Sequence, residues 1–160
     1  MSTAKFIAAV AGVFDDNFDA VLSGFETRDG LAAGYITRPT SFGTEDTFSN
    51  NWPYGFVTIN ETTFENYALA YPKAVENCMI VMRHAGESKD KTREVLQYYA
   101  DAVYNIVYEN PATRVNLGLC GYNVEDVQMD AVEYRRVENN TTKYFVIFIP
   151  LNISRIKQGE

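Results

Sequence analysis

The side chain best suited to proton transfer in this sequence is His84, the only histidine, which has Arg83 and Glu87 close by in the chain. General-base catalysis requires a positioned partner and a nucleophile, and no motif marks either one here. The sequence has no G-x-S-x-G motif and no glycine-rich phosphate loop. We therefore interpret His84 as a surface or strand-end residue.

An acidic cluster could hold Mg²⁺ for phosphodiester cleavage, because carboxylates on adjacent strands can bind this ion. Its members are Glu125, Asp126, Asp130 and Glu133. Asp130 and Glu133 are an odd number of positions apart, so on a regular strand they would point to opposite faces. A solvated strand edge whose charges discourage aggregation explains the same residues. A metal-dependent nuclease or hydrolase stays open as an alternative of another class.

The two cysteines, Cys78 and Cys120, lie in separate apolar stretches. Neither has a second cysteine or a histidine at metal-ligand spacing, so we interpret both as small buried hydrophobic residues and expect no metal or cofactor. Asp15, Asp16 and Asp19 interrupt the apolar N-terminal run, and no secretion signal or membrane anchor is visible.

Basic residues concentrate toward the C-terminus, at Arg135, Arg136, Lys143, Arg155 and Lys157. The formal net charge of −7 opposes nonspecific adhesion to nucleic acid, because such binding depends on Lys and Arg displacing counterions from phosphates. These residues could form a weak nucleic-acid patch, or they could form ion pairs with the acidic surface of a neighbouring copy.

Two helices would position these groups. Apolar residues recur at three- and four-residue steps from Phe6 to Phe25, which predicts an amphipathic helix. A second helix is predicted from Thr92 to Asn110, where an apolar stripe follows the 3.6-residue period until Pro111. Residues 27–52 are rich in Gly, Thr, Ser and Asn and predict a long loop or arm, which we expect a neighbouring subunit or a partner to order.

Four strands complete the prediction, at Pro53–Ile59, Ala74–His84, Val127–Val137 and Lys143–Ile156. Runs of hairpin-connected strands with only two helices indicate an α+β fold. We expect a single domain spanning residues 1–160. It should contain a four-stranded, mainly antiparallel sheet with both long helices packed on one face, plus the long insertion.

The last strand, KYFVIFIPLNISRI, begins apolar on both faces and relaxes into alternation at Leu151–Asn152–Ile153–Ser154. One row, made of Phe145, Ile147, Ile149, Leu151 and Ile153, is expected to pack under the helices. The other row contains Tyr144, Val146 and Phe148 and needs a second cover, which we expect from another subunit or from the 27–52 arm. With Arg135 and Arg136, these three residues form the predicted interface.

The order of elements resembles that of the tail-terminator, or tail-completion, proteins of long-tailed bacteriophages. The resemblance covers most of the chain from Pro53 onward. It rests on WPYGFVTI, on NCMIVMRHAGESKDKTREVLQYYADAVYNIV and on the hairpin DAVEYRRVENNTTKYFVIFIPLNISRI. The insertion at 27–52 and the stretch NLGLCGYNVED depart from the minimal pattern of that family.

This resemblance implies a virion protein of the tail and neck, assembled in the host cytoplasm, that is not an enzyme. It would form a hexameric ring that caps the tail tube and joins the neck or head connector, with genomic DNA passing through the bore without specific binding. The acidic charge is compatible with a bore along which DNA slides. A neck or head-completion protein of the same virion is one alternative, and a soluble dimeric binding protein of cellular origin is another.

Overall fold

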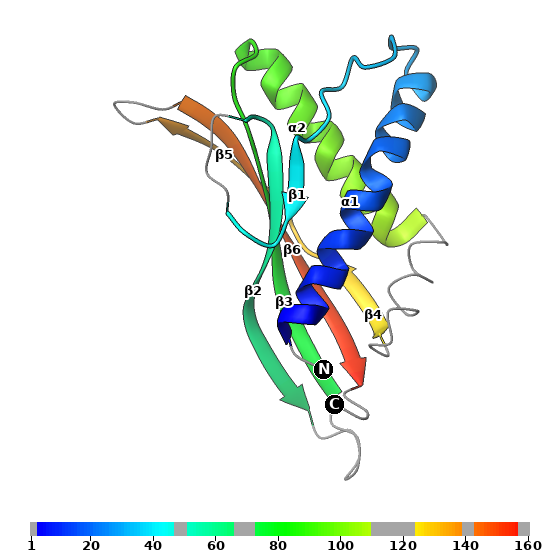
Figure 1. The fold of residues 1–160 in the computed structure, drawn as a ribbon, viewed down its shortest axis with the longest axis vertical. Helices are drawn as coiled ribbons and strands as arrows, with labels where there is room; N and C mark the ends of the chain where they lie inside the picture. Colours follow the sequence, from blue (N-terminus) through cyan, green and yellow to red (C-terminus); the bar gives the residue numbers. More distant parts are fainter. Residues whose placement is uncertain (1–2, 47–50, 66–72, 110–123, 139–142, 157–160) are drawn as a thin grey trace.

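The computed structural model describes residues 3–46, 51–65, 73–109, 124–138 and 143–156, which form one curled sheet with two long helices (Figure 1). The helices are α1 (Thr3–Arg28) and α2 (Lys89–Tyr104), and α2 continues as a π-helical turn, η1 (Asn105–Glu109). The strands are β1 (Ser41–Gly43), β2 (Tyr54–Glu65), β3 (Lys73–His84), β4 (Val124–Met129), β5 (Glu133–Glu138) and β6 (Lys143–Ile156).

The predicted fold, a four-stranded sheet with two long helices on one face, is wrong in its sheet. The described residues contain six strands in a curled, half-barrel sheet of order β1-β2-β3-β6, and β4 and β5 both pair with β6. All pairs are antiparallel except β1 with β2, which is parallel. The prediction missed β1, which lies inside the expected loop 27–52, and it joined β4 and β5 into one strand, Val127–Val137.

The break between β4 and β5 has a cause in the strand opposite. Pro150 of β6 lies at this point, and proline has no backbone N–H to contribute to the ladder. Its carbonyl oxygen still accepts a hydrogen bond from the N–H of Asp130 at 3.0 Å. Regular pairing stops after Met129, opposite Leu151, and resumes at Glu133, opposite Phe148. The chain from Met129 to Glu133 is one residue longer than the matching part of β6. The break is therefore a one-residue bulge.

Both helices share one hydrophobic core with the inner face of β2, β3 and β6. At its centre the ring of Phe18 meets that of Tyr99 edge to face, with centroids 5.6 Å apart. Burial raises the pKa of Tyr99, whose hydroxyl donates to the carbonyl of Thr37. Ser88 caps α2 by accepting a hydrogen bond from the N–H of Lys91, so the helix begins before the predicted Thr92.

The described part of the 27–52 insertion packs onto its own chain. Ile36 is 1% exposed and Phe42, in β1, is 8% exposed. Phe42 fits against Gly55 of β2, where any Cβ would lie 2.8 Å from its ring. Arg38 binds Glu26 of α1, so polar as well as apolar contacts hold the segment. The sequence did not predict these contacts of residues 29–46 with α1 and β2 of the same chain.

A buried ion pair joins the far ends of β3 and β6. Nη2 of Arg155 lies 3.0 Å from a carboxylate oxygen of Glu76, and both side chains are fully buried. The guanidinium of Arg155 also lies over the ring of Phe6 in α1, 4.4 Å from its centroid. Thr62 of β2 donates a hydrogen bond to Glu76 at 2.5 Å. Four elements of the fold therefore meet at one charge pair.

Candidate functional site

The face of the sheet opposite the helices carries a second apolar cluster, which we call the outer aromatic cluster. Its members come from β2, β3, β5 and β6 and from the segment just before β2, which contributes Trp52. They are Trp52, Tyr54, Phe56, Met79, Val81, Val137, Tyr144, Val146 and Phe148. No helix of the described chain covers this face, since α1 and α2 both belong to the inner core.

The predicted row of β6 lies within this cluster, and its cover comes partly from the same chain. Val146 is 2% exposed, whereas Tyr144 and Phe148 are half-buried. The ring of Trp52 stacks on Tyr54 and on Tyr144, with centroids 5.4 and 5.5 Å away. The end of the 27–52 insertion thus supplies part of the expected second cover. The solvent-accessible parts of the Tyr144 and Phe148 rings can make a further contact.

Arg83 lies at the middle of the outer aromatic cluster. Its guanidinium donates to the hydroxyl of Tyr54 at 2.8 Å and pairs with Asp46 at 2.5 Å. The same group lies 5.4 Å from the ring centroid of Phe56 and 5.8 Å from that of Tyr144. Burial raises the pKa of Tyr54. A cation ringed by aromatic side chains can support both apolar and polar contacts.

The two arginines of the predicted interface lie on opposite faces of β5. Arg135 reaches the outer face, where its guanidinium lies 5.3 Å from the ring centroid of Phe148. Arg136 reaches the helix side, 5.8 Å from the ring centroid of Phe145. The structure therefore places Tyr144, Val146, Phe148 and Arg135 together, as expected, and separates Arg136 from them.

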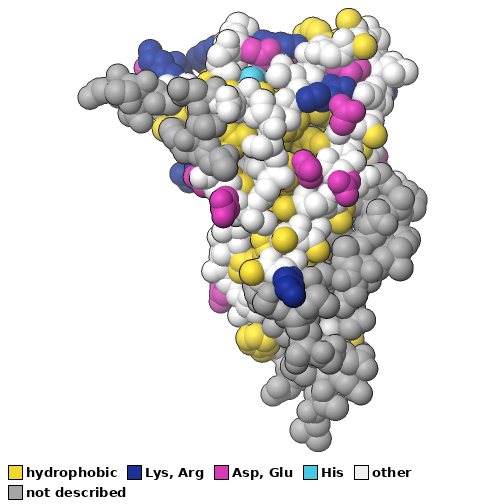
Figure 2. Space-filling view, in the orientation of Figure 1, with side chains coloured by type: hydrophobic (Ala, Val, Ile, Leu, Met, Phe, Trp, Pro, Cys, Tyr) yellow, Lys and Arg dark blue, Asp and Glu magenta, His cyan; other side chains and the backbone are white. Residues whose placement is uncertain are grey.

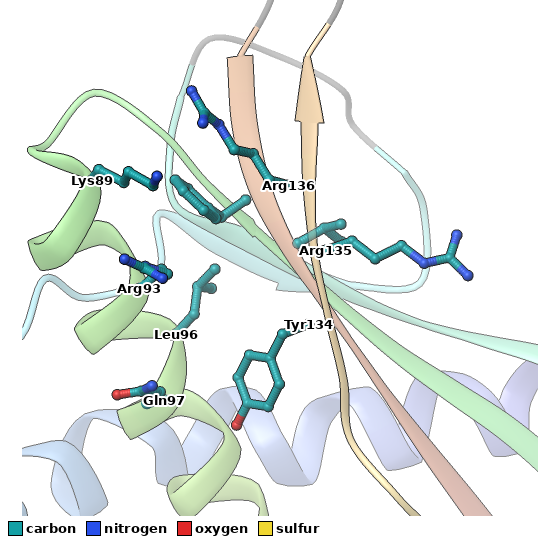
Figure 3. A pocket seen from close by; sticks show the side chains of 9 residues that line it. Lys89, Arg93, Leu96, Gln97, Tyr134, Arg135 and Arg136 are labelled. Carbon is teal, nitrogen blue, oxygen red and sulfur yellow. The ribbon is translucent and has the colours of Figure 1, made fainter.

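Arg136 belongs instead to a cavity of about 430 Å³ between α2 and the β5–β6 hairpin, which we call the basic groove. Figure 3 shows Lys89 and Arg93 of α2 on one wall, Arg136 on the other, Tyr134 below, and Arg135 turned away. Lys89 and Arg93 are one helical turn apart, so they share a face of α2. The sequence shows this spacing of Lys89 and Arg93. It does not show that Arg136 lies across the groove from them.

The basic groove continues beside a smaller cavity lined by Lys89, Arg136 and Lys143. Lys143 pairs with Glu138 at 3.1 Å, and this hydrogen bond lowers the pKa of the Glu138 carboxyl. Figure 2 shows Lys and Arg side chains gathered toward the end of the molecule where α2 begins. This end is therefore locally cationic although the whole chain carries a net charge of −7.

The candidate acid–base residue His84 ends β3 but is only 2% exposed. Its Nε2 lies 2.5 Å from Glu87, which also accepts a hydrogen bond from Thr37 at 3.0 Å. Its Nδ1 is buried without a hydrogen-bond partner. These contacts connect β3 to the start of α2 and to the segment after α1. We assign them a structural role. The prediction of a strand-end histidine is confirmed, and that of a surface histidine is wrong.

The acidic cluster is divided among separate contacts. Glu125 pairs with Lys73 at 3.3 Å and Glu133 pairs with Arg135 at 2.7 Å. Asp130 accepts the N–H of Ala131 within the bulge. Among the described residues, no three His, Cys, Asp or Glu side chains are grouped to hold a metal ion. The bulge also invalidates the argument from odd spacing, because that argument assumed one regular strand.

Cys78 is fully buried, as predicted, and burial raises the pKa of its thiol to about 12. Cys120 lies outside the described residues. Within the ranges that the structure describes, neither helix combines the length and apolar character needed to cross a membrane. No protein-family model and no curated protein matches this chain.

Proposed function

We propose that this protein is a structural protein of a bacteriophage virion, a tail terminator whose copies form a ring. The observation that carries the proposal is the outer aromatic cluster, with its partly buried Tyr144 and Phe148 on a sheet face that no described helix covers. Aromatic side chains and arginine are enriched in protein interfaces. Such a face is suited to contact with another subunit.

The arrangement of the two long hairpins also supports a ring. The helices fill the inner side of the curled sheet, and the β2–β3 and β5–β6 hairpins project at different ends of the molecule (Figure 1). Elements that project in different directions can contact two neighbours through two different patches. Repeated heterologous contacts of this kind close into a ring when the rotation between copies permits it.

In the proposed assembly, six copies cap the tail tube and join it to the neck or head connector, as the resemblance implies. Genomic DNA passes through the bore and is not bound specifically. The net charge of −7 supports this part of the proposal, because an acidic surface repels the phosphates of the moving DNA. The protein then has no catalytic role and acts through its contacts.

The test begins with the purified chain. Native mass spectrometry and negative-stain electron microscopy should detect closed rings, and the rings should bind the ends of tail tubes assembled from the tail tube protein of the same phage. Binding to the portal–connector complex without binding to the tube would favour a neck protein instead. A monomer or simple dimer that binds neither assembly would contradict the proposal.

A further inference from the structure

The basic groove holds positive charge that its own chain neutralises only in part. Within the described residues, Lys89 has no ion-pair partner. Arg93 pairs with Asp90 at 3.2 Å, but both side chains are more than half exposed to solvent. Arg136 lies 3.6 Å from Glu138, at the long end of ion-pair distances. Exposed pairs of this kind contribute little to stability, so these cations can accept other carboxylates at low cost.

The walls of the groove also offer apolar contact. The partly buried ring of Phe145 lines it, and Tyr134 is 53% exposed. A cavity of about 430 Å³ admits several side chains but not a whole helix. Its chemistry therefore fits carboxylate side chains presented from a surface that can approach closely.

The exposed side of α1 is such a surface. Asp15 and Asp16 are exposed, and within the described part of the chain neither has an ion-pair partner. On the same exposed side, the turns before and after them carry the small residues Ala8, Gly12 and Ala20. Small side chains let a second surface come near the helix, and the two aspartates then project beyond them.

We infer that the basic groove of one copy receives the acidic turn of α1, at Asp15 and Asp16, from the next copy. This interface rests on the proposed ring and names the contact that would build it. The groove is lined by α2, β5 and β6, and the acidic turn lies on the exposed side of α1, so the two surfaces belong to different elements of one subunit. A contact between two such different patches is heterologous, as a ring requires.

A nucleic acid could also be drawn to the groove, because phosphates and carboxylates are both anions. The observations favour a second copy, since the net charge of −7 opposes the binding of a long polyanion. The acidic turn of α1 supplies complementary carboxylates within the same sequence. Charge reversal on each side distinguishes these two occupants.

The experiment uses two variants of the full-length chain. In the first, Lys89→Glu and Arg93→Glu reverse the groove. In the second, Asp15→Lys and Asp16→Lys reverse the helix. All four side chains are exposed, so circular dichroism should show both variants folded. Each variant alone then sets like charges against one another at every contact, and native mass should show at least a tenfold loss of rings at low salt.

An equimolar mixture of the two variants is the decisive sample. In an alternating ring each reversed groove meets a reversed helix and each native groove meets a native helix, so every contact is complementary again. Rings should return in the mixture, with equal numbers of the two chains. A nucleic-acid site predicts no such recovery, and a mixture without rings overturns the inference.

Two further outcomes separate this interface from the proposed function. If the wild-type chain forms rings and both variants also form them as well as the wild type does, this interface is wrong and the proposed function stands. If the wild-type chain forms no ring under any condition and binds no tail tube, both ideas are wrong. Adding 1 M salt should weaken the native contact, because salt screens exposed charges.

Discussion

The carboxylate of Glu26 accepts hydrogen bonds from two nitrogens of Arg38, at 2.9 and 3.0 Å, and so connects α1 to the segment that leads into β1. The same carboxylate accepts the backbone N–H of Ile36 at 2.9 Å. The side-chain hydrogen bond with Arg38 is the main cause that lowers the pKa of Glu26 from 4.5 to about 2. The folding of residues 29–46 is therefore linked to the ionised form of one carboxyl group.

This linkage predicts a dependence of stability on pH. A folded-state pKa below the unfolded value stabilises the protein above about pH 4.5, and the contribution is lost as the pH falls toward about 2. Glu26→Gln should lower the free energy of unfolding at pH 7 by about 1–3 kcal/mol and flatten its pH dependence. Urea unfolding at pH 7, 4 and 3 measures both effects. Parallel pH curves for the two proteins would refute the linkage.

Gly55→Ala should weaken the packing of β1, because it displaces the ring of Phe42. The added Cβ would lie 2.8 and 2.9 Å from two ring carbons of Phe42, which must then move. We expect a loss of about 1–3 kcal/mol in urea unfolding, as for other overpacked sites. Gly43→Ala is the matched control, because nothing lies within 4 Å of its Cβ position. Equal effects of the two substitutions would contradict the close fit of Phe42 against β2.

The two rows of β6 should respond differently to a charge. Ile147 is fully buried beneath the helices, so Ile147→Asp places an unpaired carboxylate in the core and should prevent stable folding. Phe148→Asp should leave a folded chain that assembles poorly, because its half-buried ring belongs to the outer aromatic cluster. Circular dichroism and native mass compare the two. Unfolding of both variants to the same extent would mean that the outer cluster is part of the fold alone.

The Glu76–Arg155 pair should behave as a buried charge pair. Glu76→Leu or Arg155→Met alone removes one member of the pair and leaves the opposite charge buried, and each should cost about 3–5 kcal/mol. Replacing both together, as Glu76→Leu with Arg155→Met, should cost clearly less than the sum of the single changes. A double-mutant cycle in urea measures the coupling. Additive effects would show that the two charges do not stabilise one another.

The sequence predicted the elements that depend on local periodicity. The strand Lys143–Ile156 has the same bounds in the structure, because its inner row stays apolar from Phe145 to Ile153. The helix predicted from Thr92 begins slightly earlier and ends in a π-helical turn. For this strand and this helix, the pattern of apolar residues within one segment is sufficient to predict the secondary structure.

The missed features depend on residues that lie far apart in the chain. The break after Met129 reflects a missing N–H at Pro150, which is visible only when the two strands are aligned. The same bulge changes which residues face the helices, and this change places Arg136 in the groove with Lys89. β1 has three residues and forms because Phe42 finds a site over Gly55. No local pattern encodes these pairings.

The short length of β1 has a consequence for solubility. β1 pairs with β2 only as far as Phe56, so within the described chain no strand borders the rest of β2 on that side. An open strand edge can recruit strands of other molecules and start aggregation. Here the edge is interrupted by an irregularity between Ile59 and Glu61, and Glu61 and Glu65 add negative charge beyond it. This edge therefore carries its own protection against uncontrolled growth, while the outer face of the sheet stays available for ordered contacts.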